Sequence, residues 1–393
     1  MSDNLEPKRG GRLRRALGKI AAILLALAVV VALLFALFPK TFNLDRISRY
    51  FSYLGRDKDE SFGVISYDAD ASNDFAAFAD GLLVGNNGGL TLLDIYGVSR
   101  AVTQGSLPEP VLECCQTLGV CYSPGSSYLA GINSDGETVF DQNLSGTVID
   151  LDLCGNGWLC CLTSEGGAKS VATVYNPEQE PFFRLSSRSQ YLHVCAVSPR
   201  GDSIAAVGLG EKDGAFRSLL TILGTDEAVR DLDGKDSSAL RIDLGSELIY
   251  DAKFLDNGGL CLIGQSRLLF YDTDGRLLSE HSYADGSLQT FAFGSGFVAA
   301  AFRENQAGEE YSLLSFDPEG GELGSAAISD RLVSLSAAEG YVAVLTDQGI
   351  EIYDRALRLH NRSGTAFAAT AALARPDGSA LMVGNSKTRL YVP

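Results

Sequence analysis

Short apolar runs separated by turn residues recur along most of the chain. Seven of them have no polar position at all: LLVG at 82–85, LCCL at 159–162, IAAVG at 204–208, LCLIG at 260–264, FVAAAF at 297–302, YVAVL at 341–345 and ALMVG at 380–384. Such runs predict short strands buried on both faces. The preceding runs alternate instead, as in VIDLDL at 148–153, and Gly-rich turns such as LDNGG at 255–259 join neighbouring strands into hairpins.

A third apolar run, ending in a turn that resembles Tyr-Asp, marks a repeat. The markers are LTLLDIYG around Asp94, TVFDQN around Asp141, ATVYNPEQ around Asn176, LTILGTDE around Gly224, LLFYDTDG around Asp272, LLSFDPEG around Asp317, IEIYDRAL around Asp354 and RLYVP at Val392. They follow one another at intervals of 35 to 48 residues. A period of about 40 residues with several short strands per unit is typical of β-propeller blades.

The repeat predicts an all-β, eight-bladed propeller over residues 62–393, with seven blades as the alternative. The last unit stops at Pro393 after its third strand, while FGVISYD at 62–68 is a strand with no unit of its own. Pairing residues 62–68 with 388–392 would close the ring and cover two exposed sheet edges at once.

A transmembrane helix is predicted from Ile20 to Phe38, because this stretch has no charge, Gly or Pro. At about 1.5 Å per residue it nearly spans the roughly 30 Å hydrocarbon core of a bilayer. The alternative is a cleaved signal peptide, but the run ends in LFALFPKTF without a good cleavage site. Basic residues in segment 1–19 favour a cytoplasmic tail and an extracytoplasmic C-terminal domain in the cell membrane.

The segment 39–61 reads as a juxtamembrane linker with a short amphipathic helix. Leu44, Ile47, Phe51 and Leu54 recur at helical spacing. This stripe fits a helix lying on the membrane surface, and it fits equally a helix docked against the propeller.

Charge narrows the range of partners. The net charge is −17, and the basic tail makes the remainder still more acidic. An acidic domain repels phosphate, which argues against nucleic acid as a partner. An apolar content of 46% suits a packed globular domain rather than a disordered tail.

Eight cysteines leave the thiol state open. Cys154 and Cys160 flank the turn GNG and could face each other across a hairpin. Buried free thiols are the favoured interpretation, since a chain of this size needs no covalent staples, and one or two disulfides are the alternative. No CxxC motif and no neighbouring His supports a metal or redox site.

Carboxylates in predicted first strands are the only enzyme-like candidates: Glu113, Asp150, Asp152 and Asp251. Glycoside hydrolysis requires two such groups facing one another across a cleft. The acidic stretch DADASND at 68–74 resembles a calcium loop but lacks its central Gly and closing Glu, so it predicts a solvated connector. His193, His281 and His360 fall in different units. No catalytic, cofactor-binding or metal-binding residue is therefore assigned.

The order of basic tail, membrane span and repeats resembles an uncharacterised family of bacterial membrane-anchored propellers, the domain of unknown function 5711. SPRGDSIAAVG at 198–208, KFLDNGGLCLIG at 253–264, and the endings SALMVG and RLYVP carry the resemblance. It implies architecture and membrane topology, with no catalytic residues to transfer. The sequence departs from the family at YSPGSS, residues 122–127.

Together these features predict a non-catalytic binding or scaffold module of the cell envelope, without a cofactor. Its partners would be the lipid bilayer, through the N-terminal helix, and an envelope protein or a cell-wall glycan. The alternative is an enzyme that cleaves envelope polysaccharide. A sensor that signals inward is disfavoured by the short tail.

Overall fold

The computed structural model describes residues 63–393 except 213, 226–230, 234–238, 305–309 and 365–366. The chain divides into two compact units, residues 1–57 and 58–393, and the fold given below is that of the second. The predicted tail at 1–19, the span Ile20–Phe38 and the linker at 39–61 lie outside the described residues. Within the described ranges, no helix is long and apolar enough to cross a membrane.

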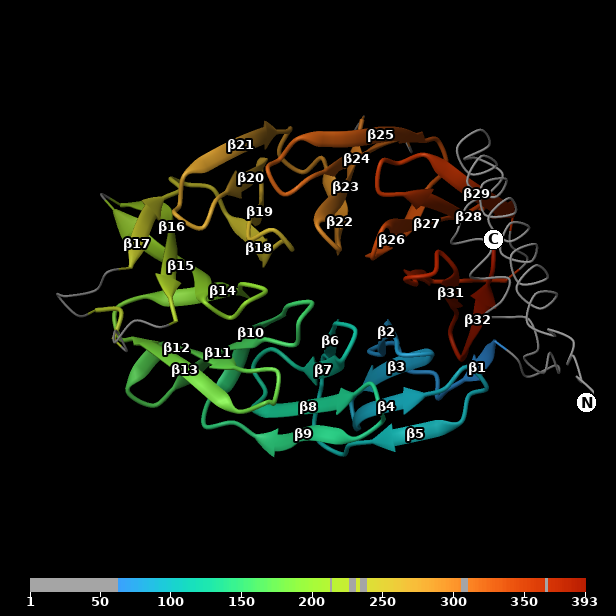
Figure 1. The fold of residues 1–393 in the computed structure, drawn as a ribbon, viewed down its shortest axis with the longest axis horizontal. Helices are drawn as coiled ribbons and strands as arrows, with labels where there is room; N and C mark the ends of the chain where they lie inside the picture. The colour runs from blue at the N-terminus through green and yellow to red at the C-terminus, as the bar shows by residue number, and fades with distance from the viewer. Residues whose placement is uncertain (1–62, 213, 226–230, 234–238, 305–309, 365–366) are drawn as a thin grey trace, which may run out of the picture. The chain divides into compact units, whose positions relative to one another are not determined.

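The described residues form eight four-stranded antiparallel sheets, which are the blades of a propeller (Figure 1). Blades 1 to 4 are β2 (Asp74–Phe78), β3 (Gly81–Asn86), β4 (Gly89–Leu93) and β5 (Ser99–Val102); β6 (Val111–Cys114), β7 (Leu118–Tyr122), β8 (Tyr128–Asn133) and β9 (Thr138–Asn143); β10 (Thr147–Leu153), β11 (Leu159–Glu165), β12 (Ala168–Tyr175) and β13 (Pro181–Ser187); and β14 (Tyr191–Val197), β15 (Ser203–Lys212), β16 (Ala215–Gly224) and β17 (Leu240–Asp243).

Blades 5 to 8 continue around the ring. They are β18 (Ile249–Phe254), β19 (Leu260–Gly264), β20 (Arg267–Tyr271) and β21 (Leu277–Ser282); β22 (Leu288–Gly294), β23 (Phe297–Arg303), β24 (Tyr311–Phe316) and β25 (Glu322–Ile328); β26 (Leu332–Ala338), β27 (Tyr341–Thr346), β28 (Gly349–Asp354) and β29 (Leu359–Gly364); and β30 (Ala371–Ala374), β31 (Ala380–Val383), β32 (Lys387–Tyr391) and β1 (Val64–Ser66). The eight-bladed prediction is confirmed, and the seven-bladed alternative is excluded.

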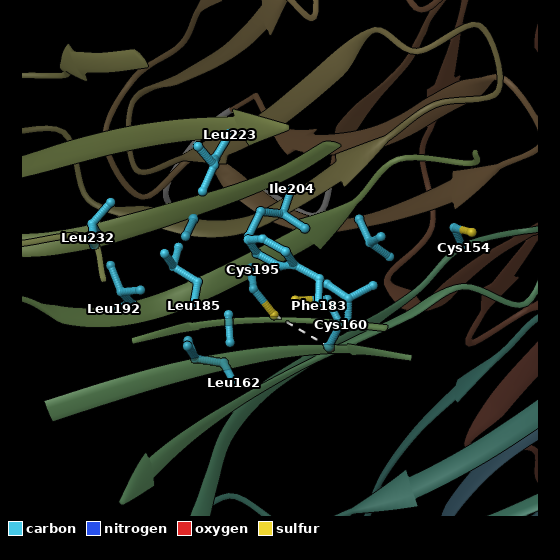
Figure 2. Packing of buried hydrophobic residues seen from close by; sticks show 14 residues of the cluster. Cys154, Cys160, Leu162, Phe183, Leu185, Leu192, Cys195, Ile204, Leu223 and Leu232 are labelled. Carbon is cyan, nitrogen blue, oxygen red and sulfur yellow. Dashed lines mark hydrogen bonds between the residues drawn. The ribbon is translucent and has the colours of Figure 1, made fainter. Parts of the chain in front are cut away.

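Most blades bury their second strand more completely than their outer strand. In blade 5, every residue of β19 is buried, whereas β21 on the outside alternates between exposed and partly buried positions. The hydrophobic clusters lie between adjacent blades: Leu162 and Phe183 of blade 3 share one cluster with Ile204 and Leu223 of blade 4 (Figure 2). Burial between two neighbouring sheets explains why the second strands lack polar positions.

The last blade takes one strand from the beginning of the domain. In Figure 1, β1 in blue lies beside the red strand β32, which separates it from β31. The two strands β1 and β32 are antiparallel, with Ile65 opposite Thr388, and the Leu390 N–H donates to the Gly63 carbonyl at 2.7 Å. Ile65 is fully buried in a cluster with Leu82 and Leu381, between blades 8 and 1.

One repeat marker was wrong. TVFDQN around Asp141 forms β9, the exposed fourth strand of blade 2, rather than its third strand. The third strand is β8, Tyr128–Asn133, which is buried except at its end. The misassignment followed from the Val-Phe pair in β9, which resembles the apolar end of a third strand although only Phe140 is buried there.

Replacing Ile65 by Ala tests ring closure. The variant should lose about 3 kcal/mol of unfolding free energy, because it leaves a cavity at the seam between the two ends of the domain. Chemical denaturation measures the loss. Ser66→Ala, an exposed position on the same strand, is the control and should change stability by less than about 0.5 kcal/mol. Equal stability of the two variants would contradict the role of β1 in closure.

Candidate functional site

The innermost strands of the blades carry equivalent positions around the ring. In blades 3 to 7, a register shift near the start of the strand marks the same place in each blade. Directly after it stand Asp150, Val194, Asp251, Thr290 and Ser334, which we call the first ring positions. Two residues later come the second ring positions, Asp152, Ala196, Lys253, Ala292 and Ser336. Because side chains alternate along a strand, both positions of one blade face the same side.

Two aspartates at these positions link blade 3 to blade 4. The Cys195 N–H donates to an oxygen of Asp150 at 2.8 Å, and the Val197 N–H donates to Asp152 at 2.7 Å. Innermost strands of neighbouring blades belong to different sheets, so their N–H groups have no ladder partner on that side. The aspartates satisfy these donors, which would otherwise be buried at a cost.

The same link recurs elsewhere with other residues. Asp74 of blade 1 accepts from the Leu112 N–H of blade 2 at 2.9 Å. In blade 7, Ser334 and Ser336 use their hydroxyl groups to accept from N–H groups of β30. These side chains therefore have a structural function between blades, whether or not they are charged.

Lys253 joins blades that are not neighbours in the ring. It extends from blade 5 to blade 3, where its Nζ lies 2.7 Å from Asp152 Oδ1 and 3.0 Å from the Leu153 carbonyl. Its Nζ also lies 3.5 Å from Glu113 Oε2 in blade 2. The Lys253 side chain is 18% exposed and that of Asp152 only 4%. Burial by itself lowers the pKa of Lys253, but attraction to Asp152 and Glu113 outweighs burial and holds the pKa well above its usual value.

A second contact spans the ring on the side where the innermost strands end. Gln116, in the turn after β6 of blade 2, donates from Nε2 to Glu339 Oε1 at 2.5 Å. Glu339 lies in the turn after β26 of blade 7. Blades 2 and 7 are not neighbours in the ring, so this contact, like those of Lys253, links blades that share no sheet-to-sheet packing in sequence order.

Burial raises the pKa of three acids near Lys253. Burial raises the pKa of Asp150 to about 7, although two backbone N–H groups act in the opposite direction. Burial, reinforced by the charges of Glu113 and Asp150, raises the pKa of Asp251 well above its usual value. The pKa of Glu113 is also raised, first by burial, even though Lys253 opposes the shift. One lysine thus balances only part of this acidic group.

The structure brings all four predicted carboxylates to the ring centre. Glu113 and Asp152 share Lys253 as their partner, while Asp150 and Asp251 interact with Glu113 through their charges. Sequence reasoning missed Lys253. Its place two residues after Asp251 in the first strand of blade 5, like that of Asp152 after Asp150, was the available signal.

Sequence reasoning also misplaced Asp74, which it assigned to a solvated connector. Asp74 begins β2 and links two blades. Asp70 instead folds its own turn by accepting from the backbone and hydroxyl of Ser72. No group of three or more His, Cys, Asp or Glu residues within the described ranges could hold a metal ion.

The remaining candidates are spread over several blades. His193, His281 and His360 belong to blades 4, 5 and 7. All eight cysteines are free thiols, six of them buried, whereas Cys114 and Cys115 are partly exposed. A cavity of about 330 Å³ lies against blade 3 and includes the Glu165–Arg184 ion pair and the half-exposed Phe182 in its lining.

The fold and its centre define a β-propeller closed by its own two ends. The profile of DUF5711, a family of unknown function, matches residues 60–364, which is most of the chain. The protein therefore belongs to this family, and the resemblance inferred from the repeats is confirmed. No curated protein matches the sequence.

Solved structures resemble the chain in fold. The C-terminal WD40 domain of Sif2 superimposes with a TM-score of 0.55 at 11% identity, covering 84% of this chain and 97% of that one. The β-propeller domain of Cps50 (Swd1) from Myceliophteria thermophila gives a TM-score of 0.46 at 12% identity, with 84% and 98% coverage. At such identities, the first match supports the WD40-like propeller fold alone.

Replacing Lys253 by Met should destabilise the domain by about 3 kcal/mol at neutral pH, because Asp152 would remain buried without its cation. Adding Asp152→Asn should recover part of the loss, since the amide oxygen can still accept from the Val197 N–H. Denaturant unfolding of the single and double variants measures both effects. Lys387→Met, at an exposed position, is the control. An unchanged K253M variant would contradict a structural role for the cross-ring contact.

Asp150 should make the domain less stable as the pH rises. Its folded pKa of about 7 exceeds the unfolded value of about 3.9, so its stabilising contribution is complete at low pH and is lost towards pH 7. Asp150→Asn should therefore reduce the stability difference between pH 5 and pH 7.5 by roughly 1–2 kcal/mol. Denaturation at both pH values checks this. Asp135→Asn, in an exposed turn, should leave the difference intact.

Proposed function

We propose that this protein is a membrane-anchored, extracytoplasmic binding or scaffold module of the cell envelope, acting without catalysis. The apolar run from Ile20 to Phe38 and the basic tail support the anchor and its orientation. The WD40-like propeller supports a binding role, since closed repeat folds present broad surfaces to partners.

The observation that carries the proposal is that the polar side chains at the ring centre already bind groups of other blades. The aspartates there accept backbone N–H groups from the next blade, and Lys253 and Gln116 form contacts across the ring. A glycosidase needs its two carboxyl groups free on either side of a sugar. Here Asp150 and Asp152 already hold blades 3 and 4 together, so we look for the partner surface outside the centre.

Blade 4 offers such a surface. Strands β15 and β16 continue past their neighbours: β14 pairs with β15 only as far as Leu209, and β17 pairs with β16 only from Leu219. Residues 210–212 and 215–217 therefore pair only with each other among the described residues. We call these two segments the blade 4 overhang. Since no other described strand pairs with these edges, they can accept a further strand, which favours a polypeptide partner over a glycan.

Exposed aromatic rings accompany the overhang. Tyr191 is opposite Leu209, which is opposite Ser218, so Tyr191 and Phe216 share one face of the sheet. They are 58% and 40% exposed. Tyr250 of blade 5 is 51% exposed. Its neighbour Ile249 is held to blade 4, because the Ile249 carbonyl accepts a hydrogen bond from His193 of β14 at 3.0 Å. Aromatic side chains are enriched at the centres of protein interfaces. We propose that an extended segment of an envelope protein binds here.

A membrane-impermeant crosslinker applied to intact cells tests the location and the surface together. The wild-type protein should be crosslinked to a specific envelope protein, and Tyr191→Ala combined with Phe216→Ala should reduce capture at least about tenfold, as loss of interface hot spots does. Leu359→Ala, an equally exposed apolar residue on blade 7, should not. If the double variant is captured as well as the wild-type protein, this surface is not the binding site. If the wild-type protein in intact cells is not labelled at all, the proposed topology is wrong.

An enzyme acting on envelope polysaccharide is the second candidate. The observation that favours it is the pKa of Asp150, about 7, which suits a general acid near neutral pH. Cleavage of cell-wall preparations by the purified domain, lost in Asp150→Asn while folding is retained, would support this candidate over the binding module.

A further inference from the structure

Two buried cysteines from different blades lie in contact. Cys160 belongs to β11 in blade 3 and Cys195 to β14 in blade 4, and they are 0% and 1% exposed. The Cys195 Sγ lies 3.6 Å from the Cys160 carbonyl oxygen, to which its thiol can donate. Figure 2 shows both residues in the apolar cluster between the two blades, with a dashed line marking this contact.

The strand register makes this proximity a fixed feature of the seam. Cys160 is opposite Asp152 in the β10–β11 ladder, so its side chain is on the face of blade 3 that meets blade 4. The Cys195 N–H is held by Asp150 at 2.8 Å, and Asp152 holds the Val197 N–H at 2.7 Å. The aspartate links described above therefore fix the backbone on both sides of the thiol pair.

The neighbouring cysteines are not placed to compete. Cys161 follows Cys160 and is on the opposite face of β11, where it lies in the cluster shared with blade 2. Cys154 lies in the turn between β10 and β11, and Figure 2 shows it away from the pair. A disulfide between Cys154 and Cys160 across the hairpin is therefore less favoured, because the contact with Cys160 is made by Cys195.

We propose that Cys160 and Cys195 form a disulfide bond that joins blades 3 and 4 when the chain folds in the presence of a disulfide-exchange oxidant. The oxidant is a low-molecular-weight disulfide or a protein disulfide oxidoreductase. One protein thiolate attacks the oxidant and releases one reduced thiol. The second protein thiol then displaces the other half, so that two protein thiols are oxidised and one disulfide is reduced to two thiols.

Burial sets when this exchange takes place. In the folded domain, neither thiol is open to a reagent, and the hydrogen bond to Cys160 and burial both raise the pKa of Cys195. Exchange requires an accessible thiolate, so the bond should form while the blades assemble. The sulfur atoms then approach to about 2.05 Å. This inference is independent of the proposed partner and of the membrane topology.

Refolding the reduced domain with a mixture of oxidised and reduced glutathione tests the inference. The product should lose about 2 Da, one hydrogen from each sulfur, and peptide mapping should link Cys160 to Cys195. Cleavage after Trp158 or Leu159 separates Cys154 from Cys160, so the two pairings are distinguishable. The linked protein should melt about 5 °C higher than the reduced one, because the bond closes a loop of 35 residues. Native protein given the same mixture should react far more slowly.

Two test variants and one control variant complete the test. Cys160→Ala and Cys195→Ala should each abolish the mass loss, whereas Cys161→Ala, the adjacent residue on the same strand, should retain it. Peptide mapping of the wild-type protein gives the answer even if a variant fails to fold. Eight free thiols after oxidative refolding, or a link between Cys160 and Cys154 instead, would overturn the proposal.

Discussion

The antiparallel pairing of β1 with β32 is the constraint on which the rest of the domain depends. Each blade buries its second strand between two neighbouring sheets. In an open ring, the first and last blades would each lack one of these neighbours and would be unstable. Joining the first and last strands gives every blade two neighbours. It also covers two sheet edges whose unpaired N–H and C=O groups would otherwise favour association between chains. Ile65, fully buried at the seam, shows that closure adds hydrophobic contact as well as hydrogen bonds.

Closure brings the innermost strands together, and this creates an electrostatic problem at the ring centre. These strands share no backbone ladder with one another. Short polar side chains replace the ladder, as Asp150, Asp152 and Ser334 show. Aspartate is a strong acceptor but loses its hydration there, which explains the raised pKa of Asp150. Lys253 offsets part of the charge from two blades away.

The same geometry keeps the contacts between blades apart from the surface that we propose for a partner. Residues that resemble a catalytic set are engaged in holding blades together, whereas exposed aromatic rings and free backbone edges occur on blade 4. The seam between blades 3 and 4 combines two aspartate links with the Cys160–Cys195 contact. Because the overhang extends from blade 4, that seam lies beside the strands that we propose to bind a partner, and its rigidity would limit their movement against blade 3.

The sequence by itself determined the strands and the number of blades, because burial on both faces leaves a continuous apolar run such as LCLIG at 260–264. It also placed Glu113, Asp150, Asp152 and Asp251 on first strands. It failed for blade 2, where the Val-Phe pair of β9 resembled a third strand. Only the tertiary structure decided which side chains meet. Lys253 and Asp152 are about a hundred residues apart in the sequence, far beyond the range of a local pattern. Cys195 contacts Cys160, although Cys154 is nearer to Cys160 in the sequence. Such contacts depend on how whole blades are arranged around the ring, and local periodicity carries no information about that arrangement.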